Sequence, residues 1–500
     1  MELSFENKTI VVCRELLRTS RVIQETAECV VPDINDDIGR IASVQTSIYL
    51  KSKDLTGRGA VVTGELTATL LYITESEKNV SFLRLTKPFT MEFEAAELPV
   101  DATAHAKLRV QHTEARILNP RKVLFNFEII GDLSCYAAEC VVAESLIPDN
   151  VQMHLHAKRE MIELPFPKIA MEKTFAINEQ YIFTGGKPMP GRIVSHQVEM
   201  LVNDTQIIGT KLIIKGNVFV SVSYISEDVN YPIKAEFTSP FSQIVETGTE
   251  NLDSSEINIE LTSAYCDLID TISGEKAADI EVHALLEIVG SRKESIAYIA
   301  DAYSNVMPAQ CSARRKQFNP KSPITMIKLS SDERINVADD CGDVLSIFTS
   351  LSQINFQSEK VQSAVTLDII YRTVNGNIAA VRRLVGLEAE YSGLNTRVSC
   401  ARLADVYLRP DGNAVDCHIV AEISVQSVCT VEINPVESVL LDEENHYDLA
   451  EFPSLCLVRA EKESLWELAK HYHSSMERIA EFNELEAGLE GKIILIPRSI

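Results

Sequence analysis

An internal repeat is the feature of this sequence that most constrains its fold. When the chain is shifted by 152 residues against itself, GRIASVQ (Gly39 to Gln45) aligns with GRIVSHQ (Gly191 to Gln197). Without any gap, 14 of the 56 positions from Gly39 to Glu94 are identical, including Tyr72 with Tyr224. Composition alone gives about four matches over that length. The chain therefore contains a duplicated unit, and one fold must serve both copies.

A third, more diverged copy follows the first two. GDVLS (342–346) takes the place of GRIAS, and SAVTLDIIYRT (363–373) brings Tyr371 to the position of Tyr72. The gap between these two pieces is four residues shorter than in the first copy, and Ser363 stands where Gly64 is expected. A tyrosine that recurs at one position of a repeated fold indicates packing at a strand end. A contact surface shared by the copies is the alternative.

The segment before each tyrosine alternates between apolar and polar residues. In the first copy Leu66, Ala68 and Leu70 alternate with threonines, a period of two that is typical of a half-buried β-strand. No amphipathic pattern of helix length recurs between the strand-like runs. We therefore predict a mainly β protein with three tandem antiparallel β-sandwich-like repeats and a small C-terminal βααβ domain. The expected boundaries are 1–155, 156–295 and 296–430 for the repeats, 431–453 for an acidic linker and 454–500 for the βααβ domain.

Charge and cysteine usage limit the kinds of partner and the compartment. The formal net charge of −25 argues against binding to nucleic acid or to anionic membranes. No run is long enough for a membrane span, and the first residues lack the plan of a signal peptide, so we expect no direct membrane insertion. The eleven cysteines are scattered without a CxxC pair, which fits reduced thiols and a cytoplasmic location.

Two stretches of one charge sign stand out locally. The run from Ala313 to Lys321 holds four basic residues and is expected to be a solvated loop, with a local anion contact as the alternative. The stretch from Val431 to Glu451 carries seven acids and no lysine or arginine. Such a stretch repels itself, and we interpret it as the extended linker.

Catalytic and metal-binding motifs are missing from the sequence. TGGKPMPG (184–191) has Tyr181 where a phosphate-binding loop needs its first glycine, so we interpret it as a turn. The pairs His154/His156 and His471/His473 are spaced two apart and have no flanking ligand signature. No nucleophile motif occurs. We expect a protein without catalytic residues, metal or cofactor; an enzyme whose groups come together only in space is the third-ranked alternative.

The last part of the chain changes period. Ser464 and Glu467 have the spacing of a helix capping box, and Leu465, Leu468, Ala469 and Tyr472 then form one apolar stripe. A second helix is expected to start near Ser474 and to end at Phe482-Asn483, before a closing strand. Trp466, the one tryptophan of the chain, lies at the edge of the stripe. We expect it mainly to pack within the module, with direct contact to a partner as the alternative.

This terminal stretch, SLWELAKHYHSSMERIAEFNEL followed by GKIILIP, resembles the LysM domain, a βααβ module that binds glycans containing N-acetylglucosamine. The resemblance implies a groove between the loop before the first helix and the loop after the second. Where the family usually has Gly-Asp, this chain has Lys462-Glu463, which adds bulk at the lip of the groove. The implied partner-binding residues are Lys462, Glu463, Ser464, Leu465, Trp466, Asn483, Glu484, Leu485 and Leu489.

The acidic β-rich repeats that end in such a module resemble the SPOCS-domain family of spore coat morphogenetic proteins from spore-forming Firmicutes. The resemblance implies a scaffold in the mother-cell cytoplasm that is recruited to the forespore surface. It also implies binding to the coat morphogenetic ATPase called stage IV sporulation protein A, and possible contacts with other coat proteins. The alternative function is a cell-wall protein that binds peptidoglycan or N-acetylglucosamine.

Overall fold

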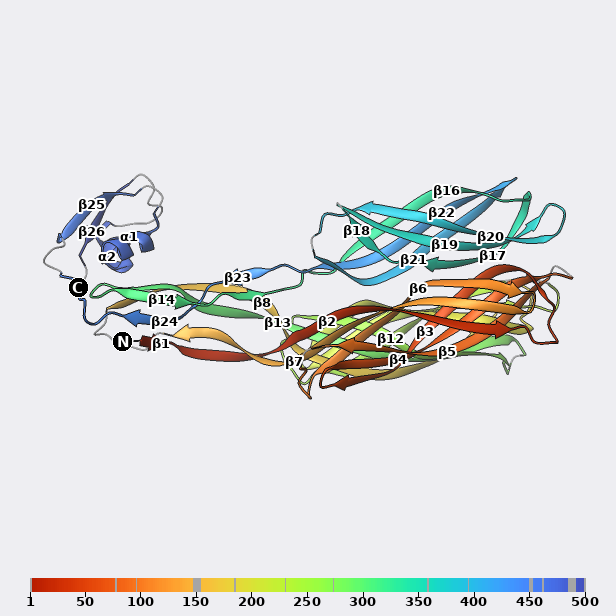
Figure 1. Cartoon of the computed structure of the whole chain (residues 1–500), viewed down its shortest axis with the longest axis horizontal. Coiled ribbons are helices and arrows are strands. Elements are labelled where there is room, and N and C mark those ends of the chain that lie inside the picture. The colour runs from red at the N-terminus through yellow and green to blue at the C-terminus, as the bar shows by residue number, and fades with distance from the viewer. Residues whose placement is uncertain are drawn as a thin grey trace.

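The computed structural model describes residues 2–76, 79–95, 97–146, 154–183, 186–229, 231–272, 274–357, 359–393, 395–448, 453–460, 463–483 and 492–498. Within these ranges the chain is almost entirely β-strand, with two short helices near its C-terminal end. Figure 1 shows an elongated molecule with three β-sandwiches at one end, a narrow β stalk and a small module at the other end. The expected mainly β fold class is confirmed.

Each copy of the repeat is a sandwich of two antiparallel sheets. In the first copy, one sheet consists of the second, third and fourth strands in that order. It packs on the other sheet, in which the sixth strand lies between the first and the fifth. The second copy has the same order. In the third copy the two sheets are joined by a single pairing of Ser330 with Glu388. The strands of the first copy are β2 (Glu6–Val30), β3 (Ile38–Thr56), β4 (Gly59–Thr74), β5 (Val80–Glu94), β6 (Thr103–Asn119) and β7 (Lys122–Leu146).

The other two copies repeat this order of strands. The second copy consists of β8 (Leu155–Ile182), β9 (Arg192–Ile208), β10 (Lys211–Ile225), β11 (Ile233–Glu246), β12 (Ser254–Asp270) and β13 (Lys276–Ser304). The third copy consists of β16 (Thr325–Asn336), β17 (Cys341–Leu351), β19 (Lys360–Thr373), β20 (Ile378–Glu390), β21 (Thr396–Asp411) and β22 (Ala414–Ser427), with the short β18 (Asn355–Gln357) beside β19. All three sequence repeats are therefore structural repeats.

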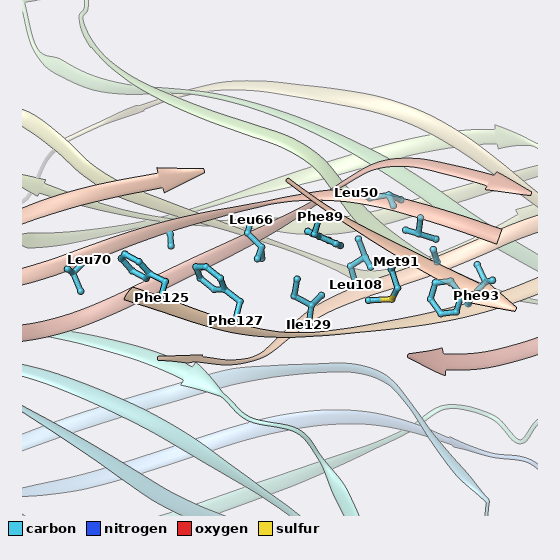
Figure 2. Packing of buried hydrophobic residues seen from close by; sticks show 14 of the residues in the cluster. Leu50, Leu66, Leu70, Phe89, Met91, Phe93, Leu108, Phe125, Phe127 and Ile129 are labelled. Atoms are coloured by element: carbon cyan, nitrogen blue, oxygen red, sulfur yellow. The ribbon is translucent and has the colours of Figure 1, made fainter. Parts of the chain in front are cut away.

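The strand alternation seen in the sequence fills the sandwich cores. Leu66 and Leu70 of β4 share one buried cluster with Phe125 and Phe127 of β7, and each of the four is at most 1% exposed. Figure 2 shows these side chains pointing into the space between the two sheets. Burial of apolar area of this kind is the main stabilising contribution to each sandwich.

The three recurrent tyrosines are packing residues, as we predicted. Tyr72, Tyr224 and Tyr371 are each at most 1% exposed. The Tyr72 hydroxyl donates to the Asp36 carbonyl at 3.3 Å, and the Tyr224 hydroxyl donates to the Pro188 carbonyl at 3.0 Å. Both carbonyls lie in the loop before the second strand of the copy. That loop in the second copy includes part of TGGKPMPG, so the described residues of this motif serve the fold.

A glycine in the third strand leaves room for the aromatic ring of a phenylalanine from the neighbouring strand to lie across it. Gly64 pairs with Phe89, and Gly216 pairs with Phe241. A Cβ on Gly64 would lie 2.3 Å from the Phe89 ring, and a Cβ on Gly216 would lie 2.1 Å from the carbonyl oxygen of Leu201. In the third copy both partners change together, because Ser363 pairs with Leu387. This explains the serine that made the third copy harder to recognise.

The three copies contact one another in a closed cycle. The second strand of one copy packs against the fourth strand of another: β3 against β20, β17 against β11, and β9 against β5. In the last of these contacts, Arg84 of β5 donates to the carbonyl oxygen of Val194 in β9 at 2.7 and 2.9 Å. Ala42, Val194 and Leu345 occupy the same repeat position and meet in one apolar cluster. The motif that reveals the repeat therefore lies where the copies meet, and head-to-tail contacts of one kind close a ring.

The stalk is built from the ends of the repeats. The outer halves of β2, β7, β8 and β13 leave the sandwiches and are joined by short strands, which Figure 1 shows running toward the small module. β1 and β14 pair with opposite edges of β24, so residues near the start of the chain pair with residues that follow the third copy. The short strands are β1 (Glu2–Ser4), β14 (Ala309–Ala313), β15 (Lys316–Phe318), β23 (Val431–Ile433) and β24 (Val436–Leu441).

Two sequence-based expectations need correction here. The predicted domain boundary at 295/296 falls inside β13, which continues into the stalk. The first part of the predicted linker, 431–453, forms β23 and β24. Glu432 pairs with Arg315, and Glu437 lies 3.7 Å from Lys316. The basic run that we expected to be a solvated loop thus pairs with two of the seven acids in the stretch that we expected to repel itself.

Candidate functional site in the terminal module

The terminal module has the predicted strand, helix, helix, strand order. Its elements are β25 (Leu455–Arg459), α1 (Leu465–His471), α2 (Met476–Asn483) and β26 (Ile493–Pro497), and the two strands are antiparallel. The predicted capping box is present: the Ser464 hydroxyl accepts the backbone N–H of Glu467 at 3.2 Å, and the Glu467 carboxylate accepts the backbone N–H of Ser464 at 2.7 Å. These bonds satisfy two backbone groups that a short helix otherwise leaves unpaired.

Trp466 packs between the module and the tip of the stalk. Its side chain is 6% exposed and belongs to the apolar core of the module. Its indole N–H donates to Oδ2 of Asp301 at 2.8 Å, and its ring lies edge-on to Tyr303 with centroids 4.8 Å apart. Both partners are in β13. The position at the edge of the apolar stripe therefore lets one side of the indole face the module and the other side face the stalk.

Three further hydrogen bonds hold the module on the stalk. Lys470 Nζ donates to the two carboxylate oxygens of Asp301 at 2.8 and 2.7 Å. The Tyr303 hydroxyl donates to the carbonyl of Ser474 at 2.7 Å. We call this set of contacts the seat: Asp301 and Tyr303 on the stalk, with Trp466, Lys470 and Ser474 on the module.

The electrostatics of the seat favour an ionised Asp301. Burial raises the pKa of this carboxyl, but the hydrogen bonds from Lys470 and Trp466 outweigh burial, so the pKa of Asp301 is lowered overall. Burial raises the pKa of Tyr303, which keeps its hydroxyl as a donor. His156 stacks on Tyr303 with centroids 5.1 Å apart, and burial lowers the pKa of this histidine.

The predicted groove residues that the structure describes mostly serve the module's own fold. Ser464 caps α1, and Leu465 is half-buried against the core. The side chain of Asn483 donates to the carbonyls of Ile479 and Leu495 at 2.7 and 2.6 Å and so ties α2 to β26. Glu463 is exposed. Lys462, Glu484, Leu485 and Leu489 lie outside the described residues. A partner groove made of these residues stays a prediction.

The outer face of the module's small sheet is apolar, which sequence reasoning missed. Leu457 and Ile493 are 69% and 67% exposed, and Leu455 is 48% exposed. The alternation in LCLVR could have shown this, because Cys456 and Val458 face the module core while Leu455 and Leu457 face outward.

A second cluster of charged groups lies where the first two copies meet. Lys53, whose side chain is 7% exposed, donates to Glu172, to Glu287 and, at 2.7 Å, to the carbonyl of Ala104. Glu287 also accepts the backbone N–H of Ala106 at 2.8 Å. A cleft of about 300 Å³ opens beside Lys53 and Glu172.

Glu260 is the most perturbed acid of this cluster. Burial, followed by the neighbouring Glu287 carboxylate, raises the pKa of Glu260 to about 8. Its oxygens accept the backbone N–H of Leu108 at 3.2 Å and the side-chain amide of Asn258 at 3.0 Å. Clustered, perturbed groups are also a sign of active sites. Here each carboxylate and the lysine are engaged in bonds that join the copies, so the arrangement serves the fold directly.

Other site classes are not supported in the described part of the chain. No three His, Cys, Asp or Glu side chains come together there as a metal site. All eleven cysteines are free. Neither of the two helices has the length and apolar character that crossing a membrane requires.

Comparison with known proteins finds a family match in each of the first two repeats. Residues 37–118 and 190–269 match the family model described as SipL, SPOCS domain. These stretches cover β3 to β6 of the first copy and β9 to β12 of the second, which are the strands around each recurrent tyrosine. No curated protein and no solved structure matches the chain. The chain thus carries two stretches that are similar to the SPOCS domain of SipL.

Proposed function

We propose that this chain is a non-enzymatic scaffold of spore coat assembly. In the mother-cell cytoplasm, its terminal module binds the coat morphogenetic ATPase, stage IV sporulation protein A, and the chain helps to localise coat material around the forespore. Two SPOCS domains support the sporulation role. The resemblance of the module to LysM and of the repeats to coat morphogenetic proteins supports the partner.

The observation that carries this proposal is the position of the terminal module. The second and fourth strands of the three repeats contact one another, whereas the module lies at the far end of the stalk (Figure 1). The module also exposes large apolar side chains, including Leu457 and Ile493. Exposed apolar residues grouped on one face mark interaction surfaces. A module displayed in this way suits an adaptor that holds a partner away from a rigid body.

A pull-down with the purified ATPase tests the proposal. We expect the full chain to retain the ATPase and a chain that ends after Asp448 to lose it, because the shortened chain keeps β24 and the stalk but lacks the module. A circular dichroism spectrum of the shortened chain controls for folding of the β body. Equal retention by both chains would contradict the assignment of the module. Tight, saturable binding of the full chain to peptidoglycan without binding to the ATPase would favour the cell-wall alternative.

Trp466→Ala extends the same experiment. Because Trp466 packs in the module core and on the stalk, we expect this variant to bind the ATPase more weakly, chiefly by loosening the module. A variant that keeps the thermal stability of the module yet loses the partner would show that Trp466 contacts the partner directly as well.

A further inference from the structure

The tip of the stalk contacts the terminal module as a short peptide ligand contacts a receptor. Asp301 and Tyr303 are two residues apart in a strand, so their side chains project from the same side. Trp466 and Lys470 are four residues apart in α1, so they lie on one face of that helix. Two side chains of a strand therefore meet two side chains of a helix in a single small contact.

Each part of this contact is chemically specific. The Asp301 carboxylate accepts one bond from the indole N–H and two from the Lys470 ammonium, all at 2.7 to 2.8 Å. The Tyr303 ring packs edge-on against the indole, and its hydroxyl reaches the carbonyl of Ser474. An acid and a tyrosine at this spacing satisfy the donors, the acceptor and the ring of the module together.

Only the ion pair of this contact is open to solvent, because Trp466 and Tyr303 are 6% and 4% exposed. The Lys470 and Asp301 side chains keep 45% and 29% of their exposure, and ion pairs at this level of exposure contribute only about 0 to 1 kcal/mol. A segment from another protein can compete for such a surface if it offers the same groups.

We infer that the α1 face of the terminal module is a recognition surface for an extended segment in which an acidic residue precedes a tyrosine by two positions. The chain's own Asp301-Ala302-Tyr303 occupies this surface until a partner segment of the same chemistry replaces it. The inference deepens the proposed function, since it names the chemistry of the partner segment, but the surface itself does not depend on which protein is the partner.

Trp466 makes the test direct because it is the one tryptophan of the chain. In the full-length double variant Asp301→Ala/Tyr303→Ala, the surface loses its internal ligand. We expect the emission of Trp466 to shift to longer wavelength, because the indole gains contact with water. A synthetic peptide IADAYSN, the sequence of residues 299–305, is then added. We expect a saturable return of the emission toward shorter wavelength.

The controls separate recognition from general loosening. The same peptide with alanine at both key positions, IAAAASN, is expected to give no response. Asp301→Asn keeps the side-chain volume and is expected to give a smaller emission shift. Unchanged circular dichroism confirms that the body of either variant is folded. An unchanged emission in the double variant overturns the inference, and so does an equal response to the two peptides or a lack of response to IADAYSN.

A final arm separates this inference from the proposed function. If the ATPase uses the same surface, the double variant retains more ATPase in the pull-down than the unmodified chain, and IADAYSN competes with it. If neither chain retains the ATPase but IADAYSN still restores the emission, the proposed function fails while the recognition surface stands.

Discussion

Two ion pairs in this molecule join separate parts of the chain and differ greatly in burial. Lys53 and Glu287, which link the first two repeats, have side chains that are 7% and 1% exposed. Lys470 and Asp301, which link the terminal module to the stalk, are 45% and 29% exposed. Removing one partner of a buried pair leaves an unpaired charge in the interior, whereas water readily replaces the partner in an exposed pair.

The comparison indicates that the molecule has one permanent set of contacts and one releasable set. The ring of repeats is held by apolar clusters and by buried charges with several bonds each. The seat of the module contains one carboxylate that accepts hydrogen bonds, one contact between two aromatic rings and one hydrogen bond donated by a hydroxyl group. The proposed adaptor role needs both kinds of contact, because the body must stay assembled while the module responds to a partner.

The largest expected effect comes from breaking the buried pair. Glu287→Ala leaves the backbone N–H of Ala106 without its acceptor and leaves Lys53 with only the more exposed carboxylate of Glu172. We expect a loss of about 3 to 5 kcal/mol in the free energy of unfolding. The measurement is urea unfolding followed by circular dichroism. Glu281→Ala, in the same strand but with a side chain that is 53% exposed, serves as the matched control and is expected to be nearly neutral. A similar midpoint for the two variants would show that the buried pair does not hold the repeats together.

The next effect comes from crowding a sandwich core. Gly216→Ala places a Cβ 2.1 Å from the carbonyl oxygen of Leu201, so the backbone must shift, and we expect a loss of about 1 to 3 kcal/mol. Gly386→Ala is the control, because a Cβ there meets no atom within 4 Å. Thermal unfolding of both variants measures the difference, and a Gly216→Ala protein as stable as Gly386→Ala would refute the tight crossing of Phe241.

A smaller effect concerns pH and the same buried cluster. Because the pKa of Glu260 is raised to about 8 from its usual 4.5, the folded state keeps a proton that the unfolded state has lost, and stability falls as the pH rises between these values. His105 acts in the opposite direction, since burial and then Lys53 lower its pKa from 6.5 to about 4, so it destabilises the fold only as the pH drops below about 6.5.

The clean window for this prediction therefore lies between pH 6.5 and about 8. We expect the urea midpoint of the unmodified chain to fall across that window and the midpoint of Glu260→Gln to change less. A pH profile of Glu260→Gln that is parallel to that of the unmodified chain would show that Glu260 is not the group responsible.

The smallest effect is at the seat. Lys470→Ala removes the cation from Asp301, and we expect it to weaken the seat by about 0 to 1 kcal/mol without changing the stability of the β body. Quenching of Trp466 emission by acrylamide should increase. Arg478→Ala in α2, whose side chain bonds the carbonyl of Arg498 inside the module, is expected to leave the quenching unchanged. Equal quenching in the two variants would mean that Lys470 does not hold the module in place.

Local patterns in the sequence predicted the repeated units well. Alternation of apolar and polar residues predicted the strands. The recurrence of a tyrosine at the position of Tyr72 predicted a packing role, and the spacing of Ser464 and Glu467 predicted the cap of α1. Each of these depends on residues that are close in the chain or on a comparison of the chain with itself. The family match confirms the first two repeats as SPOCS domains.

Contacts between distant segments could not be predicted in the same way. The stalk pairs Glu2 with Leu440, and neither residue carries a sign of the other. The acidic stretch after the third copy appeared unable to form strands because its neutralising partners, Arg315 and Lys316, lie more than 100 residues earlier. Asp301 is 165 residues from Trp466, and only the position of Trp466 at the edge of its stripe indicated a second contact.

The most direct test of the releasable module is a single urea titration of the unmodified chain. Trp466 emission reports the seat, and circular dichroism reports the β body. We predict that the emission changes at a lower urea concentration than the circular dichroism, because the ion pair of the seat is 45% and 29% exposed, whereas the pair that joins the first two repeats is buried. Coincident transitions would contradict this account and would show that the module and the repeats unfold as one unit.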